Sequence, residues 1–103
     1  MSSLRLILYS REGCCLCKGL EERLRNLSLS HLNPPVELQV IDIDAVDTPK
    51  DIRARYDLQV PVMMLGRTDL PETIELPRVS PRLNGEGLYR WLEKFLIRIP
   101  GLI

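Results

Sequence analysis

The chain lacks an excess of charge of either sign, because 14 lysines and arginines balance 14 aspartates and glutamates. It also has few aromatic residues, which make up 5% of the sequence. Domains that bind nucleic acid usually carry a basic surplus, together with aromatic side chains on which unpaired bases stack. We therefore expect no nucleic-acid partner.

Long hydrophobic runs are also missing, since no segment reaches the roughly 18 consecutive apolar residues of a membrane span. The apolar run 4–9 is too short for the core of a signal peptide, and polar residues 10–12 follow it. We expect neither membrane binding nor export. The expected location is the cytoplasm, a compartment that keeps thiols reduced.

The remaining composition is that of a folded domain. Hydrophobic residues make up 45% of the 103 positions and charged residues 27%, as in ordinary globular proteins. The length corresponds to one domain of usual size. We expect a single domain over residues 1–103 that acts as a monomer.

Apolar runs bounded by turn residues predict strands, and apolar side chains at helical spacing predict helices. The predicted strands cover 4–9, 36–43, 60–65 and 73–76, and the predicted helices cover 15–27, 47–56 and a segment from 84 onward. A strand–helix–strand order implies parallel pairing through a right-handed crossover. The short link between the last two strands implies a hairpin. The predicted fold class is α/β: a four-stranded mixed sheet with helices on both faces, in the order β-α-β-α-β-β-α.

The helices carry more detailed predictions. The first should bury one stripe formed by Leu16, Leu20, Leu24 and Leu27. The second should start at Asp47-Thr48-Pro49, where a side-chain oxygen would cap free amides and proline would occupy the first helical position. The last should have an apolar face made of Leu88, Trp91, Leu92 and Phe95, with residues 100–103 beyond it.

The three cysteines lie within four positions, at Cys14, Cys15 and Cys17. Such clustering indicates redox chemistry or metal binding rather than a framework of structural disulfides. Cys14 and Cys17 stand at a strand-to-helix junction, where the partial positive charge of the helix N-terminus lowers the pKa of a thiol. Residues three apart share a helix face, with Cβ atoms about 5–6 Å apart, so the pair can form a disulfide.

Thiolate is the species that attacks a disulfide, so we expect Cys14 to be the exposed attacker and Cys17 the resolving thiol one turn deeper. The alternative is a pair of small buried hydrophobic residues. Cys15 should lie on the polar side of the helix, and residues two apart do not face each other, so Cys15 cannot readily bond to Cys17. We predict a surface thiol there, with a third redox or modification site as the alternative.

Two segments together resemble a known family. Residues 9–17, Tyr-Ser-Arg-Glu-Gly-Cys-Cys-Leu-Cys, are similar to the glutaredoxin pattern of a strand, a basic residue, two spacers and C-P-Y-C. Residues 59–61, Gln-Val-Pro, are similar to the T-V-P segment of that family, whose proline is cis. Over nearly its whole length the chain resembles a diverged member of the glutaredoxin branch of the thioredoxin superfamily. The resemblance implies a thioredoxin-like fold and a thiol–disulfide oxidoreductase in cell redox homeostasis, with Cys14 as nucleophile and Cys17 as resolving cysteine.

The resemblance also implies binding residues for glutathione or a peptide. Pro61 matches the cis-proline beside the active disulfide, and Val60 would offer its backbone to an extended ligand. Arg11 would attract glutathione carboxylates and favour the Cys14 thiolate, while Glu86 would receive the glutathione amino group. The alternatives are a trans proline at position 61, a solvated loop charge at position 11 and an ordinary first-turn helix acid at position 86.

The implied partners are disulfide-containing proteins or glutathione, the latter as a possible co-substrate, with no tightly bound cofactor. The chain departs from the family pattern at Cys15, Leu16 and Gln59, which replace proline, tyrosine and threonine. Leu83–Gly87 matches only part of the family segment before the last helix.

Two other functions compete with the redox enzyme. The first is an iron–sulfur or other soft-metal binding module, which would need glutathione or a dimer partner because one chain offers too few cysteines. The second is an interaction domain that keeps the fold without the activity. Asp42, Asp44 and Asp47 are predicted to be caps and loop acids, with no metal site. Arg78 and Arg82 are predicted to be surface charges, with an anionic partner as the alternative.

Overall fold

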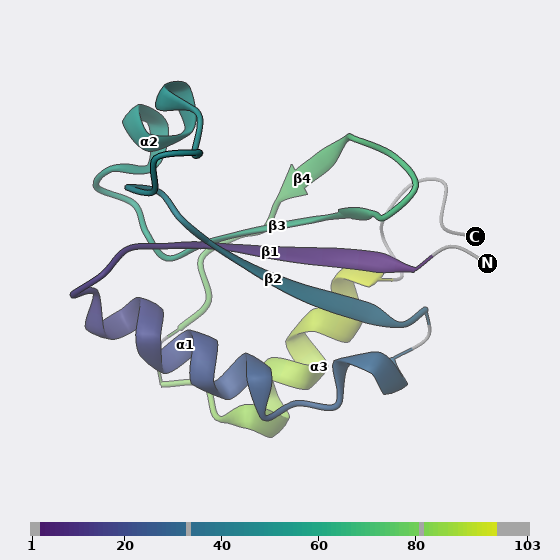
Figure 1. The fold of residues 1–103 in the computed structure, drawn as a ribbon. Helices are drawn as coiled ribbons and strands as arrows, with labels where there is room; N and C mark the ends of the chain where they lie inside the picture. Colours follow the sequence, from purple (N-terminus) through teal and green to yellow (C-terminus); the bar gives the residue numbers. More distant parts are fainter. Residues whose placement is uncertain (1–2, 33, 81, 97–103) are drawn as a thin grey trace.

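The computed structural model describes residues 3–32, 34–80 and 82–96 (Figure 1). It contains four strands, three α-helices and one 3-10 turn. In chain order these are β1 (Leu4–Ser10), α1 (Cys15–Arg25), η1 (Leu29–His31), β2 (Val36–Asp42), α2 (Lys50–Tyr56), β3 (Val62–Arg67), β4 (Thr73–Glu75) and α3 (Gly85–Leu96). The predicted order of strands and helices is confirmed. The predicted tail, residues 100–103, lies outside the described residues.

The sheet is mixed, with the strand order β2-β1-β3-β4. The central strand β1 pairs in parallel with β2, so that Leu6 lies beside Leu38, and antiparallel with β3, so that Leu6 also lies beside Leu65. The short strand β4 pairs antiparallel with β3 at the edge of the sheet. The parallel strand–helix–strand unit and the final hairpin are therefore both confirmed. Strand β3 begins at Val62 rather than at residue 60, because Pro61 has no backbone N–H to give to a ladder.

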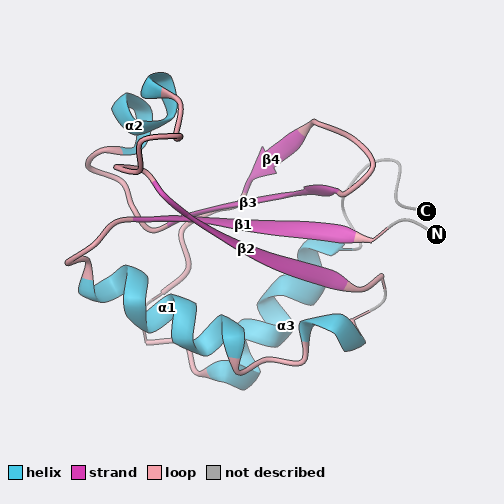
Figure 2. Cartoon of the chain, viewed as in Figure 1, coloured by secondary structure: helices cyan, strands magenta, loops and turns pink. Residues whose placement is uncertain are grey.

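The two faces of the sheet are covered unequally. Helices α1 and α3 pack against one face, and the short helix α2 lies on the other side, near one end of the strands (Figures 1 and 2). Alternate residues of a strand point to opposite faces, and the side chains beneath α1 and α3 form the main core. That core includes Leu4, Leu6, Leu8, Leu20, Leu24, Met63, Leu65, Leu88 and Leu92. Glu37 and Gln39, on the face away from this core, are exposed.

The predicted apolar stripe of α1 needs one correction. Leu20 and Leu24 are buried, but Leu16 is 52% exposed, and Cys17 is fully buried instead. Cys17, Leu20 and Leu24 follow at helical spacing, so the core-facing line passes through position 17 rather than 16. Leu27 follows the end of the helix and is half-buried.

The predicted start of α2 is wrong. The helix begins at Lys50, and the preceding Pro49 supplies no capping side chain. The Thr48 hydroxyl instead donates a hydrogen bond of 2.7 Å to the backbone carbonyl of Asp42. Thr48 therefore stabilises the turn after β2. This hydrogen bond replaces the helix-capping role that a short polar side chain can also take.

The predicted apolar face of α3 is confirmed and extends to Leu96. Leu88, Leu92 and Leu96 are buried, while Trp91 and Phe95 are half-buried and meet edge to face, with ring centroids 4.8 Å apart. Within the described residues, no helix has both the length and the apolar character needed to cross a membrane.

Candidate redox site

A sharp turn links the end of β1 to the start of α1. Gly13 adopts a positive φ of 84°, which glycine reaches without a steric penalty. The amide of Cys14 then donates to the carbonyl of Arg11 at 3.3 Å, and Cys14 becomes the N-cap of the helix. The turn therefore places the first cysteine of the motif where the free amides of the helix converge.

Cys14 and Cys17 are joined by a disulfide, with their Cα atoms 5.2 Å apart. The backbone N–H of Cys17 also donates to the Cys14 Sγ at 3.1 Å. Cys14 is half-buried, whereas Cys17 has no exposed surface. The pair is therefore asymmetric: the outer sulfur can be approached by a substrate, and the inner one is enclosed. The predicted bonding reach of the two cysteines is confirmed.

Cys15 is a free and exposed cysteine. It lies between the two bonded cysteines in sequence but takes no part in their disulfide. This placement agrees with a surface thiol, the interpretation preferred from the sequence. Across the described residues, no group of three or more His, Cys, Asp or Glu side chains is arranged to hold a metal ion. The soft-metal alternative stays a prediction that would require atoms from outside this chain.

The Val60–Pro61 peptide bond is cis, as the resemblance to glutaredoxins implies. Pro61 lines a hollow together with Leu16, which belongs to the first turn of α1. The loop before β3 and the cysteine-bearing turn therefore face each other across one space. The use of the Val60 backbone by a ligand stays a prediction.

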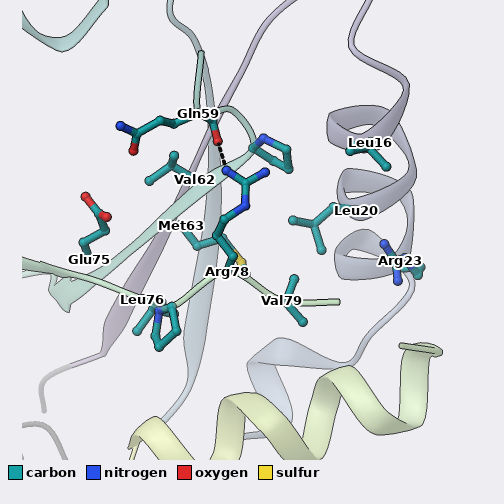
Figure 3. A pocket seen from close by; sticks show the side chains of 12 residues that line it. Leu16, Leu20, Arg23, Gln59, Val62, Met63, Glu75, Leu76, Arg78 and Val79 are labelled. Carbon is teal, nitrogen blue, oxygen red and sulfur yellow. Dashed lines mark hydrogen bonds between the residues drawn. The ribbon is translucent and has the colours of Figure 1, made fainter. Parts of the chain in front are cut away.

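The hollow beside Pro61 has a volume of about 100 Å³ (Figure 3). Its wall on the α1 side includes Leu16 and Leu20, and its other walls come from β3 and from the segment between β4 and α3. From that segment Arg78 reaches across the opening, and its Nη1 donates to the carbonyl of Gln59 at 2.8 Å (Figure 3). The sequence placed Arg78 among the surface charges, because nothing local to position 78 indicates a contact 19 residues away.

Arg11 is held in a network of its own, outside the hollow. Its Nε and Nη2 both donate to the Asp44 carboxylate at 2.9 Å. It also donates to the backbone carbonyl of Asp57 at 2.7 Å and to the Asp57 carboxylate at 2.8 Å. These hydrogen bonds raise the pKa of Arg11 and lower the pKa of Asp44. Arg11 therefore ties three loops together, and its predicted contact with glutathione carboxylates stays a prediction.

Glu86 lies in the first turn of α3, where it pairs with Arg90 at 2.8 Å. Its side chain is 73% exposed. It borders a second, shallow hollow shared with Asn26 and Tyr89, and it is not part of the wall beside Pro61. Pro61 therefore shares a hollow with Leu16, the residue between Cys15 and Cys17, whereas Glu86 lies outside that hollow. Its predicted role toward a glutathione amino group stays a prediction.

Solved structures with a similar arrangement are thioredoxin folds. The thioredoxin Deadhead of Drosophila melanogaster matches with a TM-score of 0.58 and 17% identity, covering 89% of this chain and 80% of that one. Oxidised thioredoxin O2 of Arabidopsis thaliana gives 0.56 and 15%, covering 94% and 75%. The first thioredoxin domain of mouse protein disulfide-isomerase A4 gives 0.61 and 13%, covering 96% and 66%. At these identities the likeness shows the fold, and it confirms the thioredoxin-like class.

Comparison with curated protein sequences finds no relative that matches this chain. A family model does match, and its description is a glutaredoxin-like domain, DUF836. The match runs over residues 5–93, which takes in the cysteine turn, the cis-proline and the hollow between them. With that span covered and with the fold and the cysteine pair in place, the chain belongs to the glutaredoxin-like domain family.

Proposed function

We propose that this protein is a thiol–disulfide oxidoreductase whose reactive pair is Cys14 and Cys17. In its dithiol form, the Cys14 thiolate attacks one sulfur of a substrate disulfide. A mixed disulfide forms and the other substrate sulfur leaves as a thiolate. Cys17 then loses its proton, attacks the Cys14 sulfur and releases the second substrate thiolate. Two electrons pass to the substrate, and the Cys14–Cys17 disulfide results.

The observation that carries this proposal is the asymmetry of the pair. The half-buried Cys14 Sγ sits at the helix N-cap and accepts the Cys17 amide at 3.1 Å, an arrangement that stabilises a thiolate. The enclosed Cys17 can reach only its neighbour one turn away, as a resolving thiol must.

The surroundings support a substrate that lies along the cis-proline loop. An extended ligand would pair its backbone with that of Val60, and its sulfur would then lie beside the cysteine turn. Glutathione or a dithiol protein would return the enzyme to its reduced form. We place this chemistry in the cytoplasm, in cell redox homeostasis, with disulfide-bearing proteins or glutathione as partners.

The direct test is reduction of a small neutral disulfide by the dithiol protein, with a Cys14→Ser, Cys15→Ser and Cys17→Ser series. We expect Cys14→Ser to abolish exchange, because no thiolate remains at the N-cap. Cys17→Ser should accumulate a mixed disulfide on Cys14, visible by mass spectrometry. Cys15→Ser is the matched control and should behave like the wild type. The proposal is wrong if Cys14→Ser retains the exchange rate of the wild type.

A further inference from the structure

The hollow beside Pro61 combines an aliphatic wall with two arginines: Arg23, which donates to the backbone carbonyls of Gly19 and Leu83, and Arg78. Its apolar lining includes Leu16, Leu20, Leu76 and Val79. A cavity of 150 Å³ lined by such side chains stays dry and admits benzene. The volume here is about 100 Å³, so it suits one aliphatic side chain rather than a larger ring.

Arg78 stands at this hollow with most of its hydrogen-bonding capacity unused by the described residues. Among those residues its one hydrogen bond goes to the Gln59 carbonyl, whereas a guanidinium has five N–H donors. Over the parts of the chain that the structure describes, no carboxylate forms an ion pair with Arg78. Glu75 borders the same hollow and accepts a hydrogen bond from the Tyr56 hydroxyl at 2.8 Å, so the lining holds two arginines and one glutamate. The Gln59 bond therefore holds a cation in position without neutralising it.

One wall of the hollow comes from the first turn of α1, the turn that carries the cysteines. Leu16 stands between Cys15 and Cys17 in the first turn of α1, and Pro61 lies across from it. A peptide extended along the loop at Val60 would project alternate side chains to opposite sides. Side chains two positions from its reacting cysteine lie on the same side as that cysteine, so they would meet the aliphatic wall and Arg78.

We propose that the substrate is a polypeptide disulfide whose cysteine has an aliphatic residue two positions to one side and an acidic residue two positions to the other. The aliphatic side chain enters the hollow, and the carboxylate pairs with Arg78. This inference rests on the proposed function and names its substrate class. Arg78 then determines which substrates are preferred, while Cys14 and Cys17 carry out the thiol exchange.

The test uses four peptides with blocked ends, each carrying one cysteine bonded to a neutral 2-thiopyridyl group. At the two positions that are two residues from the cysteine, one on each side, the peptides carry Leu with Glu, Leu with Gln, Ser with Glu, or Ser with Gln. The Cys14 thiolate attacks the peptide sulfur, and thiopyridone leaves and is followed by its absorbance. We expect the peptide with Leu and Glu to react about tenfold faster than the one with Ser and Gln.

Arg78→Gln should reduce the preference for Glu over Gln about fivefold, and Arg78→Lys should retain part of it. Added salt should weaken the preference in the wild type, because an exposed charge pair is screened. Arg82→Gln is the matched control: this arginine lies on the same connecting segment, is exposed and does not line the hollow. It should keep the preference of the wild type.

The outcomes separate the two proposals. Equal rates for all four peptides, or an equal loss of preference in Arg78→Gln and Arg82→Gln, would overturn the specificity inference while exchange by Cys14 stands. Rates no faster than those of a free cysteine peptide, with no resolution by Cys17, would overturn the proposed function as well.

Discussion

Arg78 lines the hollow next to Pro61 and Arg11 lies outside it, and the chain gives these two arginines different partners. Arg11 donates to both oxygens of Asp44 and to the Asp57 carboxylate, so two negative charges surround its guanidinium. Arg78 donates to a neutral carbonyl, that of Gln59, and lines the hollow next to Pro61. Arg11 therefore holds loops together, whereas Arg78 presents its charge at a hollow that a ligand can enter.

This comparison shows that a charged residue close to a motif in sequence need not be the one whose electrostatic field acts on a substrate. Arg11 precedes the cysteines by three positions, which makes it the obvious anion-binding residue in the sequence. Its charge is offset by acids from loops 33 and 46 positions away. Arg78, 64 positions from Cys14 in the sequence, is one of two arginines that the fold brings to the hollow.

The largest expected effect concerns the wall that the hollow shares with the core. Leu20 is 2% exposed, so Leu20→Ala should lower the free energy of unfolding by about 2–5 kcal/mol through lost contacts and a new cavity. Leu16→Ala, at a position 52% exposed, should cost less than about 1 kcal/mol. Urea unfolding of the oxidised protein, followed by far-UV circular dichroism, measures both. Equal losses would show that Leu16 belongs to the core rather than to the rim of the hollow.

The second largest effect is expected when the charge of Arg78 is reversed. Arg78→Glu should change the preference for an acidic over a neutral peptide by roughly 30-fold, about 2 kcal/mol, because attraction is replaced by repulsion. A lysine-bearing peptide should gain rate in this variant. Stopped-flow rates at low salt provide the measurement, with Arg82→Glu as the control for a general change in field. A similar change in both variants would contradict the special position of Arg78.

A feature of this protein could be predicted from the sequence when it depends on residues close together in the chain. Cys14 and Cys17 were identified from spacing and from a strand-to-helix junction, both of which lie within a few residues. The order of strands and helices along the chain followed from apolar runs and turn residues. Thr48 was misassigned because Asp42, six positions earlier, competes for its hydroxyl as a backbone acceptor. Periodicity predicts which face of an element a side chain lies on, but it does not predict which groups the side chain contacts there.

The same limit explains the hollow. Leu16 was placed on the buried stripe, and a shift of one position along α1 turned it toward the opening instead. The partners of Arg11 and Arg78 come from segments brought close only by the fold. Helical spacing gives the direction of a side chain to about 100° per residue, so one error in phase moves a residue from core to rim.

A smaller effect tests the apolar rim. Leu16→Gln preserves helix propensity and side-chain length but places an amide at the hollow. The preference for the Leu peptide over the Ser peptide should fall about threefold, while the urea midpoint changes little, because an exposed position contributes little to stability. Leu70→Gln is the control, since this leucine is 44% exposed and lies outside the hollow. An unchanged peptide preference in Leu16→Gln would exclude Leu16 from substrate recognition.

The smallest effect on selectivity should come from Arg11. Arg11→Gln should leave the preference for acidic peptides within about twofold of the wild type, because the lost charge was already neutralised by its own acids. It should instead lower stability at neutral pH. The pKa of Asp44 is held below its ordinary value of 3.8 by the Arg11 hydrogen bonds, so this stabilisation is present above that value and is lost as pH falls through the lowered pKa.

The urea midpoints of wild type and Arg11→Gln should therefore differ at pH 7 and converge in acid. Arg25→Gln is a matched control, because it also removes an exposed pair, that with Glu21, but within a single helix. Arg11→Gln should lose less preference for acidic peptides than Arg78→Gln if the two arginines differ as described. Equal losses would contradict that difference. A midpoint difference that persists unchanged below the Asp44 pKa would show that Arg11 fastens the loops through its Asp57 contacts rather than through Asp44.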